Sequence, residues 1–573
     1  MTSYPWEHPL GARPLPEGGV ELRVWAPNAE GVTARVGAGE HALELVAHGI
    51  WQARVDARPG DDYAFVLDGG EELPDPASRA QPHGLRGRSR ILDTAAFGWS
   101  DAAWSGVPAE DLVLYELHVG SFTPEGTFDA AIADLPRLRA LGGTAIEVMP
   151  IAEFPGRRGW GYDGVYLSAT QSSYGGPEGF QRLVDGAHRA GLAVILDVVY
   201  NHLGASGVTA VEAYGPYFTE HYETPWGKAM NFDDADCDPV REWVLQSAEG
   251  WVRDFHVDGL RLDAIHAIHD ESAHPLLREL ADRVHRRDHR ALVIAESGQN
   301  DPAVLRPARE GGLGHDAVWA DDFHHALRVL VTGERGGWYD EFGSVADLAK
   351  AYHRPFVHDG QYSAFRRRRF GAPAFDRPAR EFVVFAQNHD QVGNRAFGDR
   401  LPAEARPLAA FCTLLAPFTP MVFMGEEHGE RAPFQFFSDH IDKRIADATR
   451  EGRRQEFAAF AEFAGEEVPD PQDPATFERS KLTRRGSTKL RELYAALLRA
   501  RRALAPGVDT IEFSEDDGWL RVRRGAFELA CNFAAGPRTV PVEGRTVALA
   551  THSATLGGGG VRLPARAGAL IER

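Results

Sequence analysis

Short apolar runs alternate with amphipathic segments between residues 111 and 504. Nearly uninterrupted apolar strands of this kind are typical of a parallel sheet that is covered on its outside. Helices are predicted between the runs, for example over residues 239–255, with Asp238 as N-cap, and over 487–504. Eight strands alternating with helices predict an α/β fold, a (β/α)8 TIM barrel over residues 111–504. The runs occupy residues 112–119, 145–151, 193–199, 259–265, 292–295, 317–320, 382–386 and 421–424.

Both flanks of this region carry the shorter alternation of antiparallel strands. Before it, residues 71–110 are rich in Pro, Ala, Gly and Ser and have no sustained period, which predicts a linker lying over a neighbouring domain. We therefore expect an N-terminal β-sandwich over residues 1–70 and a small C-terminal all-β domain over residues 505–573. The predicted strands are 20–26, 31–37, 41–48, 50–57 and 62–67 in the first, and 510–514, 519–523, 527–533, 538–542 and 547–550 in the second.

Composition changes this picture little. The chain has 573 residues, 43% hydrophobic and 25% charged, and no apolar run approaches the roughly 18 residues needed to cross a bilayer. The first residues lack the basic head and apolar stretch of a secretion signal, so we expect a cytoplasmic protein without membrane contact. Cys237, Cys412 and Cys531 lie far apart and lack metal-site spacing, which predicts reduced thiols, no disulfide and no zinc.

Charge narrows the range of partners. Basic side chains number 62 and acidic ones 83, giving a net charge of −21 that argues against nucleic acid and favours a neutral or cationic substrate. The four arginines of residues 366–369 are a local exception. In so acidic a chain we interpret them as a solvated or salt-bridged face.

Candidate catalytic residues stand at the ends of four predicted strands, where a barrel of this type carries its chemistry. Asp263 ends the fourth strand, Glu296 follows the fifth and Asp390 follows the seventh, and Arg261 lies on the same side of its strand as Asp263. A single Asp at a strand end is more often an N-cap, but three carboxylates around one end of a barrel indicate an active site.

This set suits the cleavage of a glycosidic bond with retention. The reaction needs one carboxylate to attack the anomeric carbon and one carboxylic acid, about 5 to 5.5 Å away, to protonate the leaving oxygen. Arg261 would keep Asp263 ionised, and the crowding of three carboxylates would raise the pKa of Glu296 toward neutrality. Asp390 would hold sugar hydroxyls. His202 and His389 are candidate hydrogen-bond donors to the sugar, and Tyr162 offers an aromatic face.

These four segments, in this order, resemble the conserved regions of the α-amylase family of glycoside hydrolases, and the match spans the barrel. The resemblance implies that Asp263 is the nucleophile, Glu296 the acid/base and Asp390 the stabiliser of the transition state. It further implies that the sugar before the cleaved bond is held by Tyr162, Asp197, His202, Arg261 and His389.

Within the family, several flanking stretches are similar to the members that hydrolyse the α-1,4 bond next to the terminal trehalose of maltooligosyl trehalose. This resemblance implies that trehalose is released, that maltooligosyl trehalose and related α-glucans are the substrates, and that the N-terminal sandwich is like a carbohydrate-binding module. It also suggests substrate contacts for Glu426, Glu427, Phe434 and His440. The stretches are 74–79, 224–227, 231–233, 294–297, 300–302, 387–395 and 424–427.

Two departures and two alternatives bear on this interpretation. The nucleophile is followed by His266-Ala267 where many amylases have Lys-His, and Asn201 matches a calcium-binding position although the loop 203–236 is short, so we expect neither metal nor cofactor. A glucan branching or debranching enzyme is the main alternative, but Gln391–Asn394 favours the trehalose-releasing members. A non-catalytic barrel is the other, and the intact carboxylates argue against it. The sequence predicts no oligomeric state.

Overall fold

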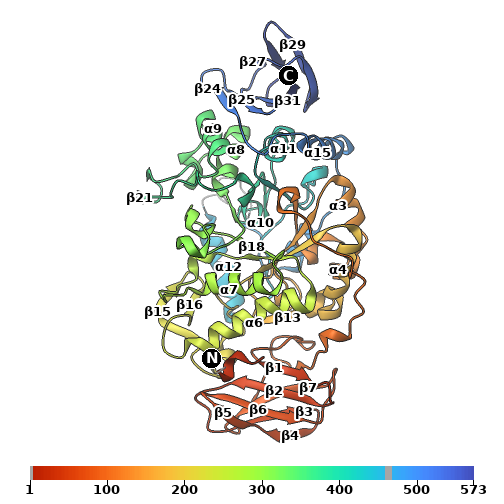
Figure 1. Ribbon diagram of the computed structural model, residues 1–573, viewed down its shortest axis with the longest axis vertical. Coiled ribbons are helices and arrows are strands. Elements are labelled where there is room, and N and C mark those ends of the chain that lie inside the picture. The colour runs from red at the N-terminus through yellow and green to blue at the C-terminus, as the bar shows by residue number, and fades with distance from the viewer. Residues whose placement is uncertain (1–3, 459–466) are drawn as a thin grey trace.

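Figure 1 shows a β-sandwich at one end of the molecule, a barrel in the middle and a second β domain at the other end. This computed structural model describes residues 4–458 and 467–573. The order of the three parts along the chain confirms the predicted fold class. No helix in the described part of the chain is long and apolar enough to cross a membrane.

The barrel is closed by eight parallel strands in chain order. Each overlaps a predicted apolar run, but several runs extend past the strand because the loop that follows is also buried, as at Met149 and Val199. The apolar pattern therefore predicts where each strand lies more accurately than where it ends. The strands are β10 (Leu114–Leu117), β11 (Ala145–Val148), β14 (Ala193–Val198), β17 (Gly259–Leu262), β18 (Leu292–Ala295), β19 (Ala317–Trp319), β22 (Phe382–Phe385) and β23 (Thr419–Phe423).

Helices cover the outside of the barrel (Figure 1). The helix predicted from residue 239 is α6, which begins two residues earlier at Cys237. Asp236, in a left-handed conformation with φ 59°, occupies the N-cap without a side-chain hydrogen bond, so Asp238 lies in the first turn instead of capping it. The helices of the described residues, among which the short α10 lies in the loop after β22, are α1 (Val119–Phe122), α2 (Phe128–Ile132), α3 (Leu135–Leu141), α4 (Gly176–Ala190), α5 (Val208–Glu212), α6 (Cys237–Phe255), α7 (Leu276–Arg287), α8 (Asp321–Thr332), α9 (Val345–His353), α10 (His389–Gly393), α11 (Arg406–Leu414), α12 (Lys443–Glu456), α14 (Pro474–Ser480) and α15 (Thr488–Arg501).

The N-terminal sandwich consists of sheets β1-β2-β6-β5 and β4-β3-β7-β8, with β9 paired to β7. The predicted strand 41–48 is in fact two strands, because the chain passes from one sheet to the other at the buried Leu43. β8 and β9 lie within the predicted linker, so this stretch adds strands to the sandwich before Trp104 and Val107 pack against the barrel interior. The strands are β1 (Gly11–Pro14), β2 (Val20–Trp25), β3 (Val32–Val36), β4 (Gly39–Ala42), β5 (Glu44–Ala47), β6 (Ile50–Val55), β7 (Asp62–Leu67), β8 (Glu72–Leu73) and β9 (Ser89–Arg90).

The C-terminal domain contains the sheets β24-β25-β26-β31-β28 and β27-β30-β29. It meets the barrel at α11, where the sulfurs of Cys412 and Cys531 lie 3.8 Å apart. These two thiols and that of Cys237 are free, as predicted. The strands are β24 (Thr510–Ser514), β25 (Trp519–Arg524), β26 (Phe527–Asn532), β27 (Arg538–Pro541), β28 (Thr546–Ala550), β29 (Thr555–Gly557), β30 (Gly560–Leu563) and β31 (Ala567–Glu572).

The arginine run forms an exposed hairpin of β20 (Tyr362–Ser363) and β21 (Arg368–Arg369). The Arg366 guanidinium lies 3.8 Å from the centre of the Phe370 ring and 3.9 Å from the Glu341 carboxylate. The run is therefore partly salt-bridged and partly solvated, as its acidic context predicted.

Candidate active site

The predicted strand ends meet at the carboxyl-terminal end of the barrel, called the mouth here. Asp197 on β14 and Arg261 on β17 are register partners. Asp263 follows β17 directly and Glu296 follows β18. Asp390 does not end a strand but is the second residue of α10, the short helix after β22.

Arg261 is the centre of the charge arrangement and is completely buried. Its Nη1 donates to both Asp197 oxygens, at 2.8 and 2.7 Å, and to Asp263 Oδ1 at 3.0 Å. Its Nη2 forms an ion pair of 2.8 Å with Glu296 Oε2. Its guanidinium carbon lies 4.2 Å from the centre of the Trp319 ring, a cation–π contact. One cation thus lies within 3.0 Å of three carboxyl groups and offsets the burial of those that are ionised.

Asp263 receives hydrogen bonds on both carboxylate oxygens. Besides Arg261 on Oδ1, the side-chain amide of Asn201 donates to Oδ2 at 2.8 Å and to the Asp263 carbonyl, also at 2.8 Å. The amide oxygen of Asn201 contacts His202, whose Nε2 lies 3.0 Å from the Tyr162 carbonyl. The Asp263 carboxylate is therefore fixed in orientation, while its side chain stays 10% exposed.

Glu296 combines burial with a fixed orientation. Burial raises its pKa to about 8, and the carboxylates of Asp263 and Asp390 add to this effect against the opposing charge of Arg261. The direction agrees with the prediction, but burial contributes more than the crowding of carboxylates. The Ala264 N–H donates to Glu296 Oε2 at 2.8 Å. It can do so because Ala264 adopts a left-handed conformation, with φ 40°.

His389 is held as a cation inside the mouth. Its Nδ1 contacts Glu116 Oε1 at 2.5 Å, and its Nε2 lies 3.5 Å from Asp390 Oδ1. Burial disfavours the cation, but the charges of Glu116 and Asp390 outweigh it and raise the pKa of His389 to about 9. The Tyr162 hydroxyl bridges His389 Nε2, at 2.8 Å, and Asp197, at 2.7 Å. Tyr162 is therefore part of the same hydrogen-bonded network.

Asp390 is the most open of the three predicted catalytic carboxylates, with a 39% exposed side chain. It accepts a hydrogen bond of 2.9 Å from Asn394. Nearby, Gln391 donates to Asp321 at 3.1 Å. Burial and the charge of Asp390 raise the pKa of Asp321 to about 6. A further carboxyl group, absent from the predicted set, thus belongs to this side of the mouth.

Four residues near the site were missed by the sequence interpretation: Glu116, Glu147, Trp319 and Asp321. The available signal was an acidic residue inside an otherwise apolar strand, as in β10 and β11. Glu147 is 1% exposed, and neither of its carboxylate oxygens has a hydrogen-bond partner among the described residues. Burial and the charge of its register partner Glu116 raise its pKa well above the usual range, so Glu147 is neutral.

The predicted substrate contacts of Glu426 and Glu427 are not supported by the structure. Both residues are buried, at 4% and 0% exposure. Glu426 accepts a hydrogen bond of 2.7 Å from Tyr494 on α15, and Glu427 pairs with Arg137 on α3 at 2.8 Å. Gly425, with φ 84°, turns the chain after β23, so both carboxylates bind the surrounding helices. Their role here is in packing.

Phe434 and His440 are also largely covered. Phe434 is completely buried and stacks on Trp160, with ring centres 5.1 Å apart. Trp160 in turn meets His389 edge to face at 5.7 Å, so Phe434 supports the site from behind. The His440 side chain is 4% exposed, and its Nε2 lies 4.0 Å from Asp163. Both side chains are thus almost inaccessible from solvent.

No group of three or more His, Cys, Asp or Glu residues that could hold a metal ion occurs among the described residues. The side-chain amide of Asn201, at the position compared with a calcium ligand, points its nitrogen at Asp263. The independence from metals and cofactors stays a prediction.

Family models and relatives of known name show which protein family the chain resembles. The model of the α-amylase catalytic domain matches residues 93–222, that of carbohydrate-binding module 48 (isoamylase N-terminal domain) matches 9–79, and a domain of unknown function, DUF3459, matches 510–570. The chain is 47% identical to a malto-oligosyltrehalose trehalohydrolase of Saccharolobus solfataricus, over 89% of this chain and 90% of the relative. It is 44% identical to one of Rhizobium sp., over 98% and 99%.

Among solved structures, a putative α-amylase from Salmonella typhimurium superposes with a TM-score of 0.90 at 37% identity, covering 98% of this chain and 99% of that one. That structure therefore shares the sandwich, the barrel and the C-terminal domain with this chain. With a barrel whose mouth gathers its carboxylates around Arg261 and with relatives that match it almost end to end, the chain belongs to the malto-oligosyltrehalose trehalohydrolases of the α-amylase family of glycoside hydrolases.

Proposed function

We propose that this chain is a retaining α-glycoside hydrolase that cleaves the α-1,4 bond adjacent to the terminal trehalose of maltooligosyl trehalose and releases trehalose. The observation that carries the chemistry is the single guanidinium of Arg261, which joins Asp263 and Glu296 at two adjacent strand ends. The choice of substrate is supported by the name that the 44% and 47% identical relatives bear.

In the first step, Asp263 attacks the anomeric carbon and Glu296 donates its proton to the leaving glycosidic oxygen. Arg261 and Asn201 each donate a hydrogen bond to one carboxylate oxygen of Asp263. The attacking oxygen is therefore already oriented before the substrate reacts. A pKa of about 8 keeps Glu296 mostly protonated at neutral pH, as a general acid requires. Trehalose departs, and the remaining glucan stays bound to Asp263 as an ester.

In the second step, a water molecule attacks the anomeric carbon and breaks this ester. Glu296, now a carboxylate, removes a proton from the water and so returns to its starting state. Because the carbon is attacked from opposite faces in the two steps, the α configuration is retained. Asp390, the most exposed of the three carboxylates, binds sugar hydroxyls while the ring distorts.

Residues around the three carboxylates hold the sugar before the cleaved bond. His389 is a charged donor, and Tyr162, Asp197 and His202 belong to the same network. Trp226, at the tip of the β15 (Phe218–Thr224) and β16 (Gly227–Met230) hairpin, is 47% exposed and stacks on His202 with ring centres 4.9 Å apart. Its free face gives a further sugar ring a surface on which to stack.

The alternative reaction, glucan branching or debranching, would share the first step and differ in the acceptor or in the bond attacked. The name of the relatives argues against it. We also infer a cytoplasmic location, since three free thiols suit a reducing compartment, and a neutral glucan substrate in keeping with the net charge of −21.

The test is to incubate the protein separately with maltotriosyl trehalose and with maltohexaose, and to identify the products by chromatography. We expect free trehalose from the first and much slower cleavage of the second. Release of only glucose or maltose, or formation of α-1,6 branches, would contradict the proposed substrate while leaving the retaining chemistry possible.

Substitutions separate the chemistry from folding. We expect Asp263→Asn and Glu296→Gln each to lower kcat by about a thousandfold or more, because each removes a group that forms or breaks a bond. Asp56→Asn, at an exposed position of the N-terminal sandwich, is the matched control and should retain full activity. Activity of Asp263→Asn at the level of the control would exclude Asp263 as nucleophile.

A further inference from the structure

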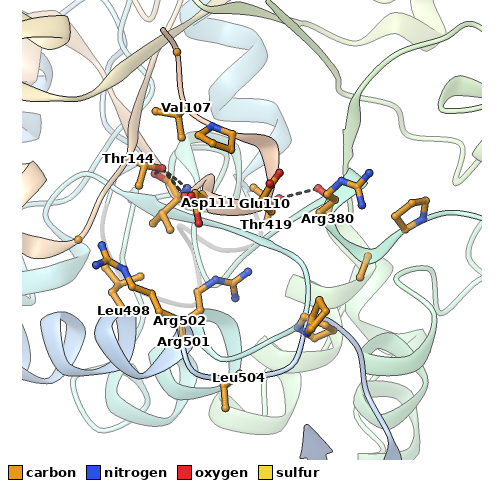
Figure 2. A pocket seen from close by; sticks show the side chains of 18 of the residues that line it. Val107, Glu110, Asp111, Thr144, Arg380, Thr419, Leu498, Arg501, Arg502 and Leu504 are labelled. Carbon is orange, nitrogen blue, oxygen red and sulfur yellow. Dashed lines mark hydrogen bonds between the residues drawn. The ribbon is translucent and has the colours of Figure 1, made fainter. Parts of the chain in front are cut away.

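A second chemical feature lies at the amino-terminal end of the barrel, opposite the mouth. A cavity of about 880 Å³ is bounded there by residues that precede barrel strands, by the end of α15 and by β25 of the C-terminal domain. Figure 2 shows Glu110, Asp111 and Thr419 on the barrel side, with Arg501 and Arg502 from the last turn of α15 and the residue after it on the other. We call this space the floor cavity.

The floor cavity is positively charged in a strongly acidic protein. Five arginines and two carboxylates line it, a formal charge of +3, whereas the whole chain carries −21. None of the five forms an ion pair within residues 4–458 and 467–573. Arginine charge gathered without carboxylate partners is typical of a site for an anion. The arginines are Arg139, Arg380, Arg501, Arg502 and Arg524.

Two of these arginines belong to the wall, Arg524 buried and Arg501 partly buried. Arg501 donates to the carbonyls of residues 414 and 416, at 3.0 and 2.5 Å, and Arg524 donates to that of residue 415 at 2.6 Å. Burial lowers the pKa of Arg501 to about 9 and that of Arg524 to about 10. The carbonyl oxygens satisfy the hydrogen bonds but leave two charges of the same sign without a counter-ion. A bound anion would offset this repulsion.

The other arginines are available to a ligand. Arg380 and Arg502 are exposed, and their guanidinium groups make no hydrogen bond to a described residue. Arg139 is also exposed, and among the described residues its guanidinium donates a hydrogen bond only to the Gly143 carbonyl, at 3.2 Å. A guanidinium presents paired donors that match two phosphate oxygens. The walls also have apolar surface, from Trp104, Val107, Leu498 and Leu504, which suits an organic body attached to the phosphate.

We propose that the floor cavity binds a small phosphorylated metabolite between the barrel and the C-terminal domain, with the exposed arginines of its lining, Arg139, Arg380 and Arg502, as the residues available to the phosphate. The site is separate from the mouth, because its lining comes from the opposite ends of the barrel strands. Because the lining joins Arg380 of the barrel to Arg524 of β25, the ligand stabilises the contact between the two domains.

The test uses two probes, inorganic pyrophosphate and glucose 6-phosphate, with glucose as the uncharged control. Binding is measured by isothermal titration calorimetry at low salt, and the melting temperature is measured with and without each probe. We compare wild type, the double variant Arg380→Gln/Arg502→Gln and the matched control Arg562→Gln, which changes an exposed arginine of β30 outside the cavity. Trehalose release reports that each variant is folded.

We expect both phosphorylated probes to bind wild type and the control variant and to raise their melting temperature, and glucose to do neither. In the double variant we expect binding to weaken at least tenfold, since charge-assisted pairs with phosphate are lost, while trehalose release is unchanged. Equal binding by the double variant, or no binding of either probe to wild type at millimolar concentration, would overturn the proposal. If pyrophosphate binds and glucose 6-phosphate does not, the proposal that the ligand carries an organic group is wrong.

Discussion

Glu116 offers the sharpest test of how charge is arranged at the mouth. In wild type, the difference between an ordinary histidine pKa of 6.5 and the value of about 9 for His389 corresponds to about 3 kcal/mol in favour of the imidazolium. Glu116→Gln removes the larger of the two favourable charges, while burial, the largest influence, remains. The pKa of His389 should then fall to 6.5 or below, leaving at most about a tenth of it charged at pH 7.5.

The consequences are a change in activity and a change in the pH dependence of stability. Loss of a charged donor to the sugar should lower kcat/KM at pH 7.5 by about ten- to a hundredfold, because such hydrogen bonds contribute about 1.5 to 3 kcal/mol. Activity should recover partly near pH 5.5, where His389 regains its proton. A histidine with a raised pKa stabilises the fold fully below pH 6.5 and loses that contribution as the pH rises through about 9, so wild type should show this decline and Glu116→Gln should not.

The assay is the pH profile of kcat/KM for trehalose release between pH 5 and 9, together with the melting temperature at each pH. Glu147→Gln is the matched control. Glu147 faces Glu116 across β10 and β11, but it is neutral in wild type, so replacing it removes no charge. An unchanged profile for Glu116→Gln, or the same change in both variants, would refute the reasoning.

Three further predictions concern other parts of the structure. Ala264→Gly should retain activity and raise stability by up to about 1 kcal/mol, since a left-handed conformation costs an L-residue about 1 to 2 kcal/mol; a lower melting temperature in calorimetry would contradict this. Trp226→Ala should raise KM roughly tenfold with little change in kcat, and steady-state kinetics showing the reverse pattern would exclude a stacking role. A thiol reagent should label Cys412 and Cys531 only after unfolding, because both are buried and the pKa of Cys531 is raised well above its usual range by its contact with Cys412 and by burial; rapid labelling of both in the native protein would count against the packing of the C-terminal domain.

The sequence allowed the barrel to be predicted because each strand is buried on both faces and is therefore an apolar run. The same property hid part of the site. Glu116 and Glu147 lie inside such runs. The neighbouring residues in the sequence do not show whether a buried acidic residue has a role in the active site or none. Their partners come from distant strands, so only the closed barrel reveals them.

Glu426 and Glu427 show a different limit of the sequence. Both follow a barrel strand, as Asp263 and Glu296 do, but their substrate contacts were expected from the family resemblance alone. The backbone decides between them, since Gly425 with φ 84° turns the chain toward the helices and Ala264 with φ 40° keeps it beside Glu296. A glycine after a strand predicts a turn, but the direction of that turn depends on what it packs against.

Arg261 also determines the electrostatic environment of Glu296 before and after proton transfer. When Glu296 releases its proton, a new negative charge arises 2.8 Å from a guanidinium that is already there. Ordinarily solvent would have to reorient around that charge, but here the compensating dipoles and charge stand in position before the proton moves. The resting contact between Arg261 and Glu296 is thus also the environment of the intermediate, and the enzyme enters and leaves that state without rebuilding its electrostatics.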